Sequence, residues 1–200
     1  MVFRNHSIST GSGAEGCLDL ARLFDNTRPV EVDLGCGKGS FLAGEAQSRR
    51  EINFLGVDRL SRKLKLLQMQ MQEHALTNVR ILRCDAFYFT RHLLPNESIS
   101  VFHIYFPDPW PKKKHKKHRF ISPWLVHALA AALIPCGQVR IMTDDEKYYE
   151  QIQESFVTEP RFERIEFCER PVENSTEYEN KFREAGKRVN KTAYKKSPLR

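Results

Sequence analysis

The chain lacks the segments that would place it in or across a membrane. None of its apolar runs approaches the roughly 20 residues that a membrane span requires, and its N-terminal sequence, MVFRNHSISTGSG, has no hydrophobic signal-peptide core. We therefore expect a cytoplasmic protein with no membrane association. Its 200 residues suit one domain. We assign residues 17–200, including a basic tail, to this domain, and the polar, Gly- and Ser-rich residues 1–16 to a mobile N-terminal segment.

The chain also lacks a cysteine pattern that would indicate disulfides or zinc. Its five cysteines are odd in number, widely scattered and without a CxxC pair, so we expect reduced thiols. His115 and His118 have an HxxH spacing, but no neighbouring Cys or acid completes a set of metal ligands. We therefore expect no metal cofactor.

Acidic residues are missing from one short stretch, and this absence locates the positive charge. Residues 112–119 contain five Lys, one Arg and two His without any Asp or Glu, in a chain of net charge +7. The tail, residues 171–200, adds eight Lys and Arg against four acids. Positive charge that is concentrated in one loop and a tail indicates a polyanionic partner such as nucleic acid.

Short apolar segments alternate with helical patterns along the chain. Strands are predicted over residues 30–34, 53–57, 79–83, 99–106, 138–143 and 162–170. Helices are predicted over residues 18–24, after residue 40, after residue 60, over residues 122–133 and over residues 147–156. The fourth of these begins at Ser122 and Pro123, and Pro135 and Gly137 end it. This alternation predicts an α/β fold, a single-domain, Rossmann-like, mostly parallel doubly wound sheet with helices on both faces.

Five of the predicted strands end in or beside an aspartate. These residues are Asp33, Asp58, Asp85, Asp108 and Asp144. Right-handed crossovers bring the carboxyl ends of parallel strands to one sheet edge, where such folds bind ligands. A single aspartate after a strand is more often a helix cap or a turn residue. The set as a whole indicates a ligand with hydroxyl groups, amino groups and positive charge.

The turn after the first strand contains closely spaced glycines, Gly35, Gly37 and Gly39. Their G-x-G-x-G spacing differs from the G-x-G-x-x-G fingerprint of dinucleotide sites, but it allows close backbone approach. Asp58 lies 19 residues after Gly39, near the roughly 20-residue spacing of an acid that binds ribose hydroxyls. Asp85 suits an adenine edge and Asp33 a ligand amino group. S-adenosylmethionine offers all these groups and has no pyrophosphate, so we predict it as the cofactor.

Six segments of the chain together resemble one family. DLGCGKGSF, GVDR, CDA, FPDPWPKKKHKKHR, TDD and TEYENKF, within residues 29–196, are similar to bacterial tRNA (guanine-N7-)-methyltransferases, which modify guanosine 46 in the tRNA variable loop. The resemblance implies that Asp33, Asp58, Asp85 and Asp108 contact S-adenosylmethionine or line its pocket, alongside Gly35 and Gly37. It also implies that Asp108 is the catalytic position.

The same resemblance implies a set of substrate-binding positions. They are Lys112, Asp144, Thr176, Glu177, Tyr178 and Glu179. The chain departs from the family pattern in a short N-terminal extension and in its TEYE sequence, where other members read TKFE. The second departure reverses the charge at Glu177.

The chemistry of guanine suggests what Asp108 does. Guanine N7 carries a lone pair and no proton, so methylation needs no base to create the nucleophile. We predict that Asp108 positions the base by accepting hydrogen bonds from N1–H and the N2 amine, while residues 112–119 bind tRNA phosphates. Trp110 is either a stacking partner for the base or a loop-packing residue. The alternatives are a methyltransferase for another RNA base and a non-catalytic RNA-binding subunit of the same fold, and no obligate protein partner is expected.

Overall fold

The computed structural model describes residues 2–3, 17–110, 119–169, 171 and 174–198. The strands are β1 (Val2–Phe3), β2 (Val30–Leu34), β3 (Asn53–Asp58), β4 (Val79–Arg83), β5 (Ile99–Tyr105), β6 (Leu133–Thr143), β7 (Phe162–Ile165) and β8 (Asn190–Lys196). The helices are α1 (Leu20–Phe24), α2 (Ser40–Ser48), α3 (Ser61–Glu73), α4 (Ala86–Tyr88), the π-helix η1 (Phe89–Leu93), α5 (Pro123–Ala132), α6 (Glu146–Val157) and α7 (Glu177–Glu184). Strands and helices alternate for most of the chain, as the sequence predicts.

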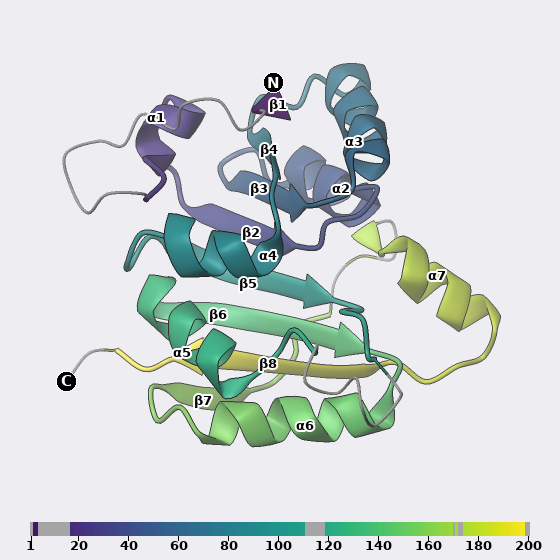
Figure 1. The fold of residues 1–200 in the computed structure, drawn as a ribbon. Coiled ribbons are helices and arrows are strands. Elements are labelled where there is room, and N and C mark those ends of the chain that lie inside the picture. Colours follow the sequence, from purple (N-terminus) through teal and green to yellow (C-terminus); the bar gives the residue numbers. More distant parts are fainter. Residues whose placement is uncertain (1, 4–16, 111–118, 170, 172–173, 199–200) are drawn as a thin grey trace.

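The strands form an eight-stranded sheet in the order β1-β4-β3-β2-β5-β6-β8-β7 (Figure 1). Strands β1 to β6 pair in parallel, and β8 is antiparallel to both β6 and β7. The order runs outward in opposite directions from β2 and β5, because β3 and β4 lie on one side and β6 on the other. Such a reversal leaves a crevice for ligands at the carboxyl ends of the two central strands.

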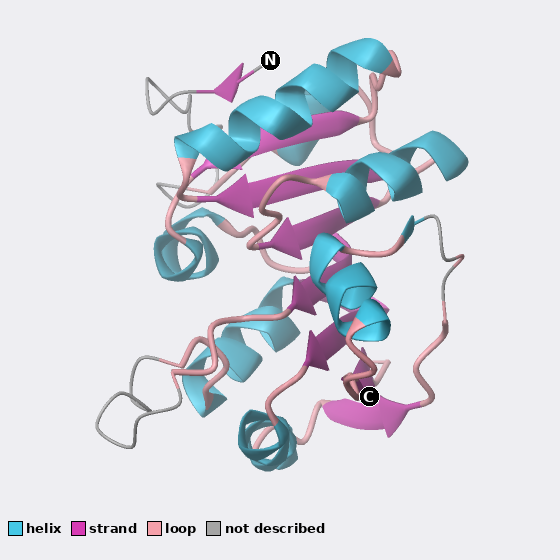
Figure 2. Cartoon of the chain, turned by 90° about the vertical axis from the view of Figure 1, so that its right-hand side faces the viewer, coloured by secondary structure: helices cyan, strands magenta, loops and turns pink. Residues whose placement is uncertain are grey.

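Helices lie on both faces of the sheet (Figure 2), and each face has its own hydrophobic core. One core contains Phe89 of η1, Leu125 of α5 and Ile152 of α6, and the other contains Leu42 of α2 and Leu67 of α3. All five side chains are fully buried, and each such burial contributes about 1.5–3 kcal/mol. The predicted mostly parallel, doubly wound sheet is therefore confirmed.

The boundaries of the predicted elements follow the local sequence to within about two residues, apart from two larger differences at β6 and β7. β2 and β4 have the predicted bounds, and Ser122 caps α5 by accepting a hydrogen bond from the Leu125 N–H. β6, however, begins directly after α5, so Pro135 and Gly137 lie inside a strand. The pairing between β5 and β6 shifts register there, and this irregularity accommodates both residues. β7 ends at Ile165 and not at residue 170.

The C-terminal tail supplies two elements that the sequence prediction lacks, α7 and β8. α7 begins with a capping box, in which Thr176 Oγ1 accepts from the Glu179 N–H and the Glu179 carboxylate accepts from the Thr176 N–H, both at 3.0 Å. β8 inserts between β6 and β7. Its Lys196 is 2% exposed, and the ammonium donates to Leu133 O at 2.7 Å and to Glu97 at 3.1 Å. Part of the positive charge in the tail therefore serves the fold.

Several predictions concern residues outside the described part of the chain. Val2 and Phe3 pair in parallel with β4, whereas residue 1 and residues 4–16 of the predicted mobile segment fall outside it, as do residues 111–118 with Lys112. Within the described ranges, no helix is both long and apolar enough to cross a membrane.

Candidate active site

Two loops meet at the carboxyl ends of β2 and β5. The strands pair in parallel with Asp33 opposite His103, so the turn at residues 35–39 and the loop at residues 106–110 leave the sheet side by side. One segment carries the predicted glycines and the other carries Asp108. The reversal in strand order thus unites two motifs that are far apart in the sequence.

The glycine turn is held to β3 and exposes its backbone. Gly35 N donates to Val57 O at 2.8 Å, and Gly37 N donates to the Asp58 Oδ2 at 3.0 Å. Gly35 and Gly37 have φ values of 87° and 56°, which non-glycine residues rarely adopt. A Cβ added at Gly35 would meet no described atom within 4 Å. A ligand can therefore approach the main chain of the turn directly.

Asp58 binds the glycine turn with one carboxylate oxygen and its own loop with the other. Oδ2 accepts from Gly37 N, and Oδ1 accepts from Leu60 N at 2.8 Å. Each oxygen of an ionised carboxylate has two acceptor sites, so both can still accept from a ligand hydroxyl. Asp58 therefore links the shape of the turn to the predicted ribose position.

Two more of the four predicted cofactor aspartates lie at the ends of the strands beside β3. Asp33, on β2, is only 5% exposed. Asp85 follows β4, is exposed and caps α4, because its Oδ1 accepts from the N–H groups of Phe87 and Tyr88 at 3.0 and 3.2 Å. Since β2, β3 and β4 are neighbours in the sheet, the structure brings the three acids to one edge.

The loop after β5 holds Asp108 in a defined orientation. Phe106 and Trp110 have positive φ values of 52° and 41°, a conformation that costs roughly 1–3 kcal/mol for residues other than glycine. Asp108 Oδ1 accepts a hydrogen bond from the Trp110 N–H at 3.0 Å, and the side chain is exposed. The carboxylate is therefore oriented by its own loop and open to a substrate.

Arg119 supports the Asp108 loop from inside the protein. It is 3% exposed. Its Nε donates to Pro109 O at 2.6 Å, its Nη1 donates to Gln151 Oε1 at 2.7 Å, and its Cζ lies 4.7 Å from the Tyr148 ring centroid. A guanidinium engaged in this way does not reach an RNA phosphate. The structure therefore corrects the prediction that placed Arg119 among the phosphate-binding residues.

α7 contacts both loops of the candidate site and lies beside the tips of β2 and β5 (Figure 1). Glu177 Oε1 accepts from the Lys38 ammonium, in the glycine turn, at 2.7 Å. The Tyr178 ring lies 5.6 Å from that of Phe106, in the Asp108 loop. The reversed charge at Glu177 is thus matched by a cation in this chain. Because this ion pair is exposed, it contributes little to the stability of the protein, and its main effect is to orient α7.

The predicted substrate-binding positions fall into two groups. Asp144, Glu177 and Tyr178 are exposed at the sheet edge that also carries Asp108. Thr176 and Glu179 form the capping box of α7, and Glu179 is 7% exposed. The first group can reach a substrate directly, whereas the second holds the start of the helix that presents Glu177 and Tyr178.

A buried polar network behind the site is absent from the sequence prediction. His103 is fully buried, with Nε2 2.8 Å from Glu31 Oε2 and Nδ1 2.7 Å from the Tyr105 hydroxyl. Arg49 Nη1 donates to Glu31 Oε1 at 2.8 Å. Burial raises the pKa of Glu31, but the hydrogen bonds and charges of His103 and Arg49 outweigh it and lower that pKa to about 2. The local signals of this network were polar residues within apolar strands, Glu31 in VEVDL and His103 in ISVFHIY.

The cysteines are free thiols, as predicted. Burial, followed by the charges of Asp33 and Asp58, raises the pKa of the Cys36 thiol in the glycine turn well above its usual value, so this side chain acts as a small apolar group. Among the described residues, no group of three or more His, Cys, Asp or Glu side chains is arranged to hold a metal ion.

Comparison with known sequences shows which proteins the chain is similar to. The model of a family described as "Putative methyltransferase" matches residues 27–192. A tRNA (guanine-N(7)-)-methyltransferase of Alkalilimnicola ehrlichii is 33% identical over 183 residues, which cover 90% of this chain and 77% of the relative. A protein of the same name from Streptomyces avermitilis is 38% identical over 149 residues, covering 74% of this chain. The chain spans only 51% of the length of that second relative.

Two solved methyltransferase structures share the fold of this chain. The 16S rRNA methyltransferase KamB superposes with a TM-score of 0.67 at 14% identity, covering 94% of this chain and 98% of its own. The aminoglycoside resistance methyltransferase NpmB1 gives a TM-score of 0.62 at 13% identity, covering 89% and 92%. At such identities the likeness concerns the fold, and it confirms the predicted Rossmann-like methyltransferase architecture.

Proposed function

Because the chain belongs to the tRNA (guanine-N(7)-)-methyltransferase family, we propose that it transfers a methyl group from S-adenosylmethionine to N7 of a tRNA guanine. The target is guanosine 46 of the variable loop, as the sequence resemblance implies. One observation carries the proposal: the pairing of β2 with β5 sets the open glycine turn beside the Asp108 loop. A cofactor held by the first is then next to a base held by the second.

The sheet edge suits the groups of S-adenosylmethionine. The open backbone at Gly35 and Gly37 admits a ligand, and we assign its ribose hydroxyls to Asp58, its adenine edge to Asp85 and its amino group to the side of Asp33. When bound, the cofactor supplies an electrophilic methyl group. Three carboxylates at this edge also favour a ligand that carries positive charge.

Asp108 positions the guanine and removes no proton. The N7 lone pair is the nucleophile, and bound S-adenosylmethionine would supply the methyl carbon and would keep the electron pair of the broken carbon–sulfur bond on its sulfur. The Asp108 carboxylate, oriented by the Trp110 N–H, accepts hydrogen bonds from guanine N1–H and the N2 amine. Near-attack geometry of this kind can supply up to roughly 7–11 kcal/mol, and the carboxylate also offsets the positive charge of the methylated base.

Binding of tRNA relies on residues around this site. The basic residues 112–118, which include Lys112, bind phosphates with an affinity that falls as salt rises. Asp144, Glu177 and Tyr178 contact the substrate near the target base. Thr176 and Glu179 act through the start of α7. We expect the protein to work in the cytoplasm without an obligate protein partner.

Incubation of unmodified tRNA with labelled S-adenosylmethionine, followed by nucleoside mass spectrometry, tests the proposal. Wild-type protein should form 7-methylguanosine, and Asp108→Asn should lose this activity although it keeps an acceptor for the Trp110 N–H. Asp25→Asn is the matched control, because Asp25 is 87% exposed at the end of α1. Absence of 7-methylguanosine from a folded protein that binds the cofactor would contradict the proposal, and another methylated nucleoside would favour a different target base.

A further inference from the structure

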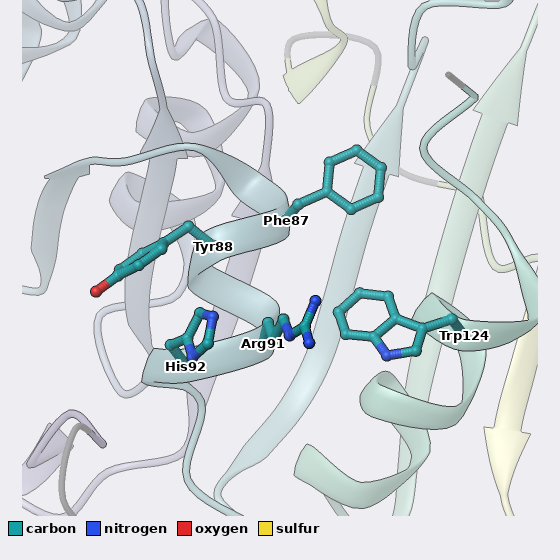
Figure 3. A pocket seen from close by; sticks show the side chains of 5 residues that line it. All are labelled: Phe87, Tyr88, Arg91, His92 and Trp124. Atoms are coloured by element: carbon teal, nitrogen blue, oxygen red, sulfur yellow. The ribbon is translucent and has the colours of Figure 1, made fainter. Parts of the chain in front are cut away.

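Three aromatic side chains are exposed on one face of the molecule, outside the candidate active site. Phe87 and Tyr88 of α4 and Trp124 of α5 are 40%, 55% and 44% exposed. Together with Arg91 and His92 of η1, they line an open pocket of about 370 Å³ (Figure 3). We call these five residues the aromatic patch. Large exposed side chains gathered in this way mark an interaction surface more often than single exposed ones do.

Arg91 combines positive charge with the aromatic rings of the patch. Its Cζ lies 6.0 Å from the centroid of a Trp124 ring, and the Phe87 ring lies 6.5 Å from that of Trp124. Arg91 and Phe87 extend toward Trp124, while Tyr88 and His92 lie together at the other end (Figure 3), with ring centroids 4.9 Å apart. No carboxylate among the described residues forms an ion pair with Arg91. A cation and exposed ring surfaces are therefore presented together.

The position of the aromatic patch connects it to the predicted RNA-binding segment. α4 starts directly after Asp85, at the candidate cofactor edge. Phe87 packs edge-to-face against Phe120, with ring centroids 4.8 Å apart. Phe120 follows the basic residues 112–119 in the chain. Directly after the residues predicted to bind phosphates, the described chain therefore has a residue that contacts the aromatic patch.

We propose that the aromatic patch binds an unpaired nucleotide of the tRNA other than the methylated guanine, with the base stacked on Trp124 or Phe87 and its phosphate at Arg91. The proposal rests on the proposed function, because it needs an RNA substrate. Aromatic rings beside a guanidinium are the groups with which proteins bind unstacked bases.

The charge of this surface favours RNA over a second copy of the chain. Two copies that met through the aromatic patch would bring together two Arg91 side chains. Like charges brought together in this way oppose association, whereas the phosphates of an RNA neutralise them.

Tryptophan fluorescence measures this contact directly. The chain has two Trp residues, so Trp124 is the sole tryptophan in a Trp110→Phe variant, and unmodified tRNA should quench its emission. Trp124→Ala should weaken tRNA binding about 5- to 150-fold, and Trp124→Tyr should retain most of the affinity. Arg91→Gln should lower the slope of log affinity against log salt by about one unit. Turnover at saturating tRNA should stay near the wild-type value in these three binding variants.

α3 packs on the other face of the sheet and offers matched controls. Lys65→Gln removes the same charge as Arg91→Gln, and Met69→Ala truncates a side chain that is 63% exposed; both should bind tRNA like the wild type. Equal affinity of Trp124→Ala, Arg91→Gln and the controls would overturn the inference. So would a Trp124→Ala variant that turns a dimer into a monomer without losing tRNA affinity. Quenching of Trp124 by tRNA without any 7-methylguanosine would contradict the proposed function alone.

Discussion

Replacing Arg119 by Met tests how the Asp108 loop is held in place. Met keeps much of the length of the side chain but removes the donors to Pro109 O and Gln151 Oε1. It also removes a positive charge that lies 3.8 Å from Asp145 Oδ1. The change therefore acts on the loop from within the protein and leaves the surface charge almost unaltered.

The contacts of Arg119 set the expected loss of stability. Each hydrogen bond from a charged donor contributes about 1.5–3 kcal/mol, and a cation over a ring contributes about 0.5–2 kcal/mol. Met retains the apolar contacts of the side chain. Pro109 is half-buried, so water can donate a hydrogen bond to the Pro109 carbonyl in place of Arg119. We expect the free energy of unfolding to fall by about 3 kcal/mol, as is typical of a broken buried interaction.

The same substitution should reduce turnover without weakening tRNA binding. Phe106 and Trp110 have strained backbone conformations in this loop. Without the hydrogen bond from Arg119, we expect the loop to relax out of them. A displacement of the positioning group by about 1 Å costs roughly 100-fold in rate, so kcat should fall by about that factor. The affinity for tRNA and its salt dependence should not change, because the guanidinium of Arg119 contacts the protein and not a phosphate.

Urea unfolding, single-turnover methylation and tRNA binding at several salt concentrations separate these effects. Arg161→Met is the matched control, because Arg161 pairs with Glu159 at 2.7 Å beyond the end of α6. This control should lose stability and keep a normal kcat. A wild-type kcat in Arg119→Met would refute the reasoning, and so would a salt slope that is shallower by about one unit, since this result would place Arg119 on a phosphate.

Three further predictions address the cofactor, the RNA and the buried network. Asp108→Ala should lose turnover while its cofactor affinity, measured by calorimetry, falls less than that of Asp58→Ala; equal losses would assign Asp108 to cofactor binding. The second prediction concerns four lysines of the basic residues 112–118, namely Lys113, Lys114, Lys116 and Lys117. Replacing all four by Gln should weaken tRNA binding and lower the slope of log affinity against log salt by about three units. An unchanged slope would contradict phosphate contact. The pKa of Glu31, about 2 against an ordinary 4.5, means that the unfolded chain binds the proton first, so about 3 kcal/mol of stability is lost as the pH falls from about 4.5 to about 2. Glu31→Gln should reduce this pH dependence in urea unfolding at pH 5 and pH 3, whereas equal pH dependence in both proteins would show that Glu31 does not cause it.

The central strands and the motif loops could be predicted from the sequence because their signals are local. A parallel strand buried on both faces is a continuous apolar run, and the glycines and prolines that follow β2 and β5 mark its end. Strand order explains why the glycine turn and Asp108 share one site, and the right-handed crossover rule supplies most of that order. The sequence therefore predicted the sheet edge and the aspartates along it.

The tail was harder to predict because its signals depend on distant partners. The sequence of β8, NKTAYKK, is polar and does not indicate a strand inside a sheet. Its Lys196 can be buried there because Glu97 and a backbone carbonyl, both from other parts of the chain, accept its hydrogen bonds. α7 had one local signal, the Thr176 to Glu179 capping-box spacing. Its contact with the glycine turn through Lys38 and Glu177 joins residues that no local pattern connects.

The sequence by itself determined the fold class and predicted the sheet edge and the residues of the candidate site, because hydrophobic periodicity and turn chemistry act over a few neighbouring positions. Only the tertiary structure decided which charges remain available to a ligand. Arg119 lies in a run of cations yet is buried against Pro109 and Gln151, and Arg91, in an unremarkable segment, lies exposed beside Trp124. Whether a side chain meets solvent or another segment depends on how distant parts of the chain pack, and this packing is a property of the whole fold.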